Sequence, residues 1–238
     1  IHLKLTNRDG HLTLDFTGTS PQVKGSINCT KGATFHSVSM TIGTVLQSHV
    51  PLNHGFYRTL EMIVPEGNFL NVSPPGAVAA RGLAIFRVQN VIWGALSKMM
   101  PDRMFACGVG QDTGVTIAGN YPDGKAFVYQ EFLNVCWGGA PNMDGWDALS
   151  QPGLTHRNTP VEHIEAEQPL RIEQYSIVPN TGGPGKYRGG MSLGRAYRLT
   201  GVKEALIQMR TDRQQHMAYG LQGGKPGTGS RNTLNPGP

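Results

Sequence analysis

The heptapeptide at residues 156–162 (HRNTPVE) gathers side chains that a small-molecule site uses. Arginine can bind a carboxylate or phosphate through two parallel hydrogen bonds, asparagine can orient a carbonyl group, and histidine can transfer a proton near neutral pH. We therefore predict that His156, Arg157 and Asn158 line a substrate site. In the alternative interpretation these polar groups only satisfy the backbone of a loop, and Pro160 leads into the next strand.

A dense glycine run follows at residues 181–190 (TGGPGKYRGG). Consecutive glycines can expose backbone N–H groups that bind an anion. However, no Gly-Lys-Ser/Thr sequence and no helix pattern follows the run, so it does not match a nucleotide-binding loop. The favoured interpretation is a set of tight turns between strands.

A further arginine, Arg81, stands at the start of a strongly helical stretch. The first turn of a helix carries unpaired N–H groups and a partial positive charge, which attract anions. Arg81 is therefore our candidate for a second substrate contact with a negatively charged group. The alternative is a solvated residue of the first helical turn.

Metal ligands and catalytic nucleophiles are harder to find in this chain. The eight histidines never occur as HxH or HExxH, and the carboxylates of residues 144–167 are only loosely grouped. We predict no metal site within this segment. Three separated cysteines form no CxxC pair, so neither a disulfide framework nor a structural zinc is expected. Cys107 could meet His156 as a nucleophile and base, but no local motif supports this pairing, and the catalytic residues stay unassigned.

Composition narrows the functional classes. The 238 residues have a formal net charge of +5, 38% hydrophobic residues and 16% charged residues, which is typical of a globular protein. Lysine and arginine are scattered, with no basic run interleaved with aromatic residues, so nucleic-acid binding is not expected. No stretch has the roughly 20 apolar residues of a membrane span. No signal peptide is visible, and the cytoplasm is the expected compartment.

Hydrophobic periodicity indicates the elements that would position these residues. Spacing of three to four residues predicts helices at 30–50 and 81–100. Alternation and turn residues predict strands at 1–5, 12–16, 59–64, 69–72, 115–118, 126–135, 170–178, 192–199 and 204–210. We therefore predict an α+β fold. Residues 1–145 would form an α+β region, and residues 146–238 a β-rich region with an irregular tail, with a soft boundary within 137–152.

An ordered set of short motifs resembles the hydantoinase B/oxoprolinase family. Each motif is weak alone, but the set is collinear over nearly the whole chain: DFTGTSPQ (15–22), GSIN (25–28), PLN (51–53), VPEG (64–67), ARGL (80–83), GAL (94–96), PDR (101–103), NTPVE (158–162), GKYRGG (185–190), and the glycines of 220–227. Family members are considerably longer, so the resemblance implies that this chain is the C-terminal portion of a B-type subunit.

The resemblance implies an ATP-dependent hydrolase of cyclic amides, such as a hydantoinase, 5-oxoprolinase or caprolactamase. ATP would bind a companion hydantoinase A-type subunit. A divalent metal would be held by the remaining N-terminal part of the B-type subunit, with its ligands outside this chain. Two alternatives stay open: a subunit of an ATP-dependent acetone or acetophenone carboxylase, and a non-catalytic docking region of such a complex. The substrate class is left open by variation near residues 110–114.

Overall fold

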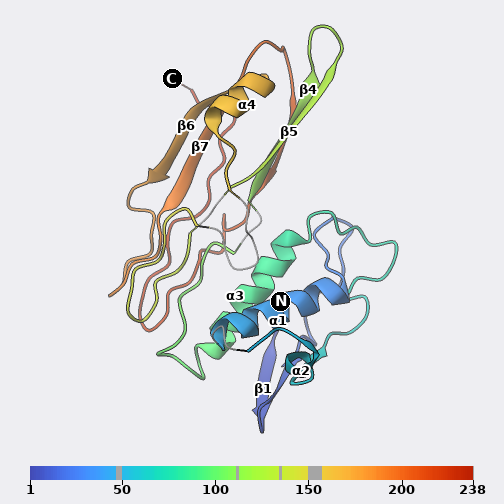
Figure 1. The fold of residues 1–238 in the computed structure, drawn as a ribbon, viewed down its shortest axis with the longest axis vertical. Helices are drawn as coiled ribbons and strands as arrows, with labels where there is room; N and C mark the ends of the chain where they lie inside the picture. Colours follow the sequence, from blue (N-terminus) through green and yellow to red (C-terminus); the bar gives the residue numbers. More distant parts are fainter. Residues whose placement is uncertain (47–49, 111–112, 134–135, 150–156, 238) are drawn as a thin grey trace.

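The computed structural model describes residues 1–46, 50–110, 113–133, 136–149 and 157–237. Its elements form two groups along the chain (Figure 1). The first group combines a small sheet with helices, and the second consists mainly of antiparallel strands with a short helix. The described residues thus confirm the predicted α+β class. No helix among them is long and apolar enough to cross a bilayer.

The N-terminal sheet has the order β1-β2-β3. β1 (Lys4–Arg8) and β2 (His11–Asp15) form an antiparallel hairpin close to the predicted strands at 1–5 and 12–16, with β1 shifted toward the turn. Asp9 and Gly10 connect them with φ angles of 50° and 81°, the positive values that a two-residue hairpin turn requires. β3 (Leu60–Ile63) then joins β2 in parallel. The predicted extended stretch at 69–72 is wrong: the Asn71 N–H donates to the Asn68 carbonyl at 2.8 Å, which makes a turn.

Two helices cover this sheet. α1 spans Lys31–Val45, α3 spans Gly82–Leu96, and the single turn α2 spans His54–Tyr57. Both long helices end earlier than the ranges 30–50 and 81–100 predict. At the end of α3 the Leu96 carbonyl accepts the N–H groups of Met99 and Met100, at 2.9 and 2.8 Å, which turns the chain out of the helix. The core between the helices and the sheet includes the fully buried side chains of Leu14, Phe16, Val38, Val88, Ile92 and Trp93.

The second group packs a three-stranded sheet against a two-stranded ribbon. The sheet has the order β5-β4-β8, with β4 at Gly114–Asn120, β5 at Ala126–Phe132 and β8 at Leu206–Arg210. β6 (Leu170–Val178) and β7 (Ser192–Leu199) make the ribbon and coincide with the predicted ranges. The shared core contains Val115, Ile117, Phe127, Tyr129, Ile164 and Leu170.

One element was not predicted. α4 (Val161–Glu167) begins directly after Pro160, at a place where the sequence pattern indicates a loop leading into a strand. Proline is compatible with a helix start because it lacks the N–H that would be left unpaired there. The helix has only seven residues and one buried anchor, Ile164. It is therefore too short to produce a recognisable hydrophobic period.

The division into 1–145 and 146–238 stays a prediction. Several contacts cross it, among them the pairing of β8 with β4, with Ala118 opposite Leu206 and Gly114 opposite Arg210. Beyond β8, the described residues up to 237 contain no helix or strand.

Candidate functional site

The glycine run lies in a junction where four irregular segments meet: residues 105–110, 136–147, 181–191 and 213–230. Gly182, Gly183 and Gly190 are not among the glycines with a φ in the left-handed region, so positive φ does not explain them. They instead allow backbones to touch. A Cβ on Gly183 would lie 2.9 Å from the Gly227 nitrogen, and one on Gly145 would lie 2.5 Å from the Gly190 nitrogen. Close backbone packing therefore requires glycine at these positions, whereas the expected tight turns between strands stay a prediction.

Two aspartates fasten the run to the loop after Trp137. The Asp147 carboxylate accepts from Arg188 Nη1 at 2.9 Å and from the Met191 N–H at 2.6 Å, and Asp144 accepts the Arg188 N–H at 2.9 Å. The Arg188 guanidinium holds the pKa of the Asp147 carboxyl below its usual value. These carboxylates, considered above as loosely grouped metal candidates, are thus used as hydrogen-bond acceptors.

The junction encloses a cavity of about 380 Å³. This volume is within the range of small-molecule sites. Its lining draws on all four segments and includes Cys107, Cys136 and Tyr219. Residues with charged or polar side chains, such as Lys186 and Lys225, also line it, so side chains as well as backbone groups could recognise a ligand there.

The two cysteines of the cavity are buried and protonated. Burial raises the pKa of the Cys136 thiol to about 12. Burial also raises the pKa of Cys107, although Arg213 opposes the effect. A nucleophilic cysteine needs the opposite shift, because the thiolate is the reactive form. The possible pairing of Cys107 with His156 involves a residue outside the described ranges. Within them, Cys107 Sγ accepts from Arg213 and donates to the Gly108 carbonyl.

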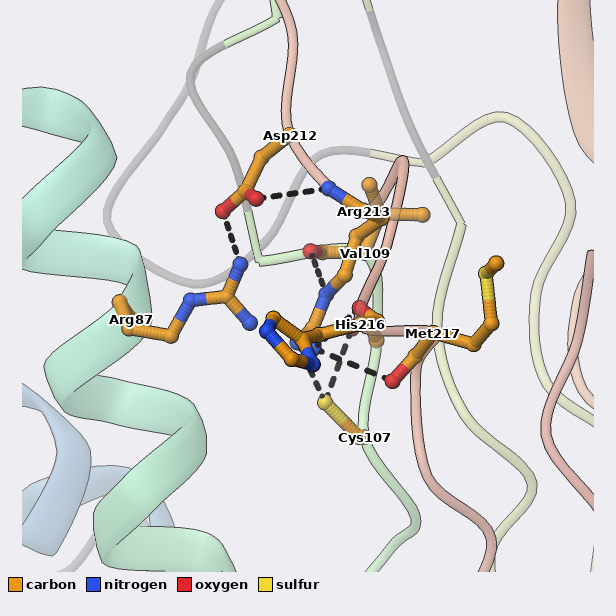
Figure 2. A network of polar contacts seen from close by, with 8 residues as sticks. Arg87, Cys107, Val109, Asp212, Arg213, His216 and Met217 are labelled. Atoms are coloured by element: carbon orange, nitrogen blue, oxygen red, sulfur yellow. Dashed lines mark hydrogen bonds and ion pairs between the residues drawn. The ribbon is translucent and has the colours of Figure 1, made fainter. Parts of the chain in front are cut away.

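Arg213 is the centre of a dense polar network behind the cavity wall (Figure 2). Its side chain is almost completely buried, and burial lowers the pKa of its guanidinium. The acceptors of its guanidinium among the described residues are neutral: Nε donates to the Val109 carbonyl at 2.8 Å, Nη2 to Cys107 Sγ at 2.8 Å, and Nη1 to the Met217 carbonyl at 3.3 Å. Further bonds reach the carbonyls of Gly108 and His216. Arg213 thus ties the segment of Cys107 to the segment after β8.

A second arginine connects this network to the first half of the fold. Arg87 reaches from α3 and pairs with the Asp212 carboxylate, whose other oxygen accepts the Arg213 N–H at 2.7 Å (Figure 2). That bond helps to hold Arg213 at a φ of 61°, which is uncommon for a residue with a side chain. Two guanidinium groups face one carboxylate, so the network has a net positive charge. It would favour an anionic ligand nearby.

The same face of α3 contacts the segment that lines the cavity. The Tyr219 hydroxyl donates to the Asn90 carbonyl at 2.6 Å, and a Cβ on Gly94 would lie 2.7 Å from that hydroxyl. Burial raises the pKa of Tyr219, so it acts as a neutral donor. α3 therefore braces the wall of the cavity.

The predicted site residues are dispersed. His156 lies outside the described residues. Arg157 is exposed, and within the described part of the chain the buried Oδ1 of Asn158 has no hydrogen-bond partner. Arg81 is exposed at the start of α3, near the buried Cys29. The described residues show no contact between Arg81 and the pair 157–158, so their role in substrate binding stays a prediction.

Possible metal ligands are not gathered in one place among the described residues. Among them no three histidine, cysteine or carboxylate side chains lie close enough to hold a metal.

Sequence reasoning missed the arginine network. Arg87 looks like an ordinary polar residue of an amphipathic helix, and Asp212-Arg213 like a solvated charge pair after a strand. The pairing Arg87–Asp212 spans most of the chain, so no local pattern reveals it.

The chain is similar to known proteins along nearly its whole length. A family model described as hydantoinase B/oxoprolinase matches residues 1–237. The chain belongs to the hydantoinase B/oxoprolinase family. An uncharacterised protein of Methanocaldococcus jannaschii is 32% identical over 228 residues, which are 95% of this chain and 39% of that protein. 5-oxoprolinase 1 of Arabidopsis thaliana is 30% identical over 237 residues, 98% of this chain and 18% of that protein. The chain therefore spans less than half the length of these relatives.

A solved structure shares the fold of this family member. The nucleotide-free structure of an acetone carboxylase, titled as ATP-dependent, matches with a TM-score of 0.82 over 96% of this chain and 31% of that chain. The sequence identity is 19%, so the likeness concerns the fold.

Proposed function

We propose that this chain is part of the B-type component of an ATP-dependent enzyme that hydrolyses cyclic amides. The family match over residues 1–237 carries the proposal. The relative named 5-oxoprolinase supports a cyclic amide as the substrate class. Because the chain spans only 18% of that relative, the activity is proposed for a longer enzyme that contains it.

In this proposal ATP binds to a companion hydantoinase A-type subunit. Water attacks an unactivated amide slowly, so opening an unstrained cyclic amide gains from coupling to ATP. In the proposal, ATP and any metal belong to other parts of the complex. This chain would contribute a rigid, positively charged wall near the substrate, with His156, Arg157, Asn158 and Arg81 as the proposed contacts.

The test is substrate-stimulated ATP hydrolysis. The longer protein would be purified with its companion and offered hydantoins, 5-oxoproline and simple lactams while phosphate release is followed. We expect at least one cyclic amide to raise phosphate release and to be opened in parallel. An absence of stimulation by all three classes, with an assembled complex, would contradict the proposal.

Two control measurements separate the alternatives. Incorporation of labelled bicarbonate into a ketone substrate would indicate a carboxylase instead of a hydrolase. Arg157→Ala and Asn158→Ala test a purely structural role, because turnover and complex assembly are measured separately. Unchanged turnover in both variants would assign this region to docking, whereas lost turnover with intact assembly would support substrate contacts.

A further inference from the structure

The cavity at the junction changes character from its opening to its interior. Lys186 and Lys225 line it and are exposed, so they stand at the opening. Met104, Cys107 and Cys136 also line it and are buried, so they stand at the interior. A molecule that fills the cavity would therefore meet positive charge at one end and apolar or thiol groups at the other.

The charges on the lining favour an anion. Within the described part of the chain, the lining holds two lysines, Lys186 and Lys225, and one carboxylate, Asp102. The ion pairs between described residues involve neither lysine. Lys186 lies over the Tyr187 ring, with its Nζ 5.5 Å from the ring centre. The arginine network behind the wall has a net positive charge of its own (Figure 2), so a bound anion would be attracted by both groups of charges.

Backbone N–H groups beside the cavity are already paired. The Gly189 N–H donates to the Gly183 carbonyl at 2.9 Å, and the Lys225 N–H donates to the Pro184 carbonyl at 2.8 Å. A phosphate bound to a glycine segment usually accepts from several free N–H groups of that segment. Recognition of charge therefore depends on the two ammonium groups. A carboxylate has a single negative charge and needs fewer donors than a phosphate, so it suits this arrangement better.

We propose that the cavity binds a small carboxylic acid in its anionic form, with the carboxylate near Lys186 and Lys225 and an apolar body inside. The volume of about 380 Å³ is sufficient for a small organic molecule. Among the described residues, Arg81, Arg157 and Asn158 are not on the lining. The site is therefore additional to the substrate contacts proposed above, and it does not depend on the hydrolysis of a cyclic amide.

Calorimetric binding of benzoate to the longer protein that contains this chain tests the proposal. Benzoate carries one carboxylate on a compact apolar ring, and benzamide is an uncharged molecule of the same shape. We expect benzoate to bind more tightly than either benzamide or inorganic phosphate. No binding of benzoate, or equally tight binding of benzamide or phosphate, would overturn the proposal. The measurement needs neither ATP nor turnover, so its outcome is independent of the proposed function.

Two lysine substitutions locate the bound carboxylate. Lys186→Gln combined with Lys225→Gln should weaken benzoate binding about tenfold, because each exposed charge contact contributes about a factor of three. Lys203→Gln is the matched control, since Lys203 is equally exposed and is not on the lining. Its affinity for benzoate should not change. An unchanged affinity in the double variant, or an equal loss in the control, would contradict the site.

Thiol labelling supplies a second readout of position. Bound benzoate should slow the reaction of Cys107 and Cys136 with methyl methanethiosulfonate, because both cysteines line the cavity. Cys29 is not on the lining and is the internal control, so its rate should stay the same. Mass spectrometry of the labelled peptides distinguishes the three thiols. Unchanged rates at both cavity cysteines in saturating benzoate would place the ligand elsewhere and refute the proposal.

Discussion

Substitution of Gly139 by alanine tests whether close backbone packing holds the junction together. A Cβ at this position would lie 2.7 Å from the Tyr187 carbonyl oxygen and 3.0 Å from that of Arg188. Both neighbours are backbone atoms, so no flexible side chain can move aside. The Gly139 carbonyl also accepts the Ala106 N–H at 2.8 Å, which ties a third segment to the same residue.

The size of the effect follows from these contacts. A carbon and an oxygen normally approach to about 3.3 Å, so the new methyl group forces a shift of roughly half an ångström. Overpacking of this kind costs about 1–3 kcal/mol. Distortion of the hydrogen bond to Ala106 adds about 1 kcal/mol. We expect a loss of about 3 kcal/mol in the free energy of unfolding, which corresponds to about 1 M in the urea midpoint.

Urea denaturation followed by tryptophan fluorescence is the assay, because Trp137 and Trp146 lie in the junction. Gly32→Ala is the matched control. Gly32 lies in the first turn of α1 with no atom within 4 Å of its would-be Cβ, so alanine there should leave stability unchanged or raise it by up to about 1 kcal/mol. Equal midpoints for the two variants would refute the packing explanation.

Two further predictions concern charge and ionisation. Arg213→Lys should lower the free energy of unfolding by about 2–4 kcal/mol, because one ammonium group cannot reach the five acceptors of the planar guanidinium. The control is Arg198→Lys at an exposed position, which should change this free energy by less than about 0.5 kcal/mol. Similar losses for the two variants in urea denaturation would contradict the argument. Burial raises the pKa of Cys136 to about 12, above the value of about 8.5 for an unfolded chain. Its stabilising contribution is therefore complete below about pH 8.5 and decreases as pH rises toward 12, by up to about 1.4 kcal/mol per pH unit. Cys136→Ala should make the alkaline loss of stability less steep in denaturation titrations between pH 8 and 11, and an identical slope would contradict the assignment.

Short-range sequence patterns correctly predicted the elements that depend on neighbouring residues. The hairpin at Asp9-Gly10 follows from residues that tolerate positive φ, and β6 and β7 follow from length and alternation. The ends of α1 and α3 were overestimated because apolar spacing continues into turns, where hydrogen bonding, not hydrophobicity, ends the helix. α4 was missed since seven residues carry too little periodicity.

The candidate site was less predictable, for a physical reason. A glycine-rich segment is easy to recognise in a sequence. Its composition does not show whether glycine is needed for a turn with positive φ or for close contact between two backbones. Only the partner segment distinguishes them, and for Gly183 that partner is Gly227. Arg213 is similar: an arginine after a strand is usually solvated, and its burial depends on acceptors from Val109 and Met217.

The pairing of β8 with β4 has a consequence for how the chain is made. Ala118 meets Leu206 only after β5, α4, β6 and β7 have been synthesised. The β4–β5 hairpin can form early from neighbouring residues, whereas the third strand must close a long loop, whose entropic cost delays it. During synthesis one edge of β4 therefore stays open and able to pair with another chain. Folding of this half is completed only when residue 210 has left the ribosome, so a chain stopped before that point would expose an aggregation-prone edge.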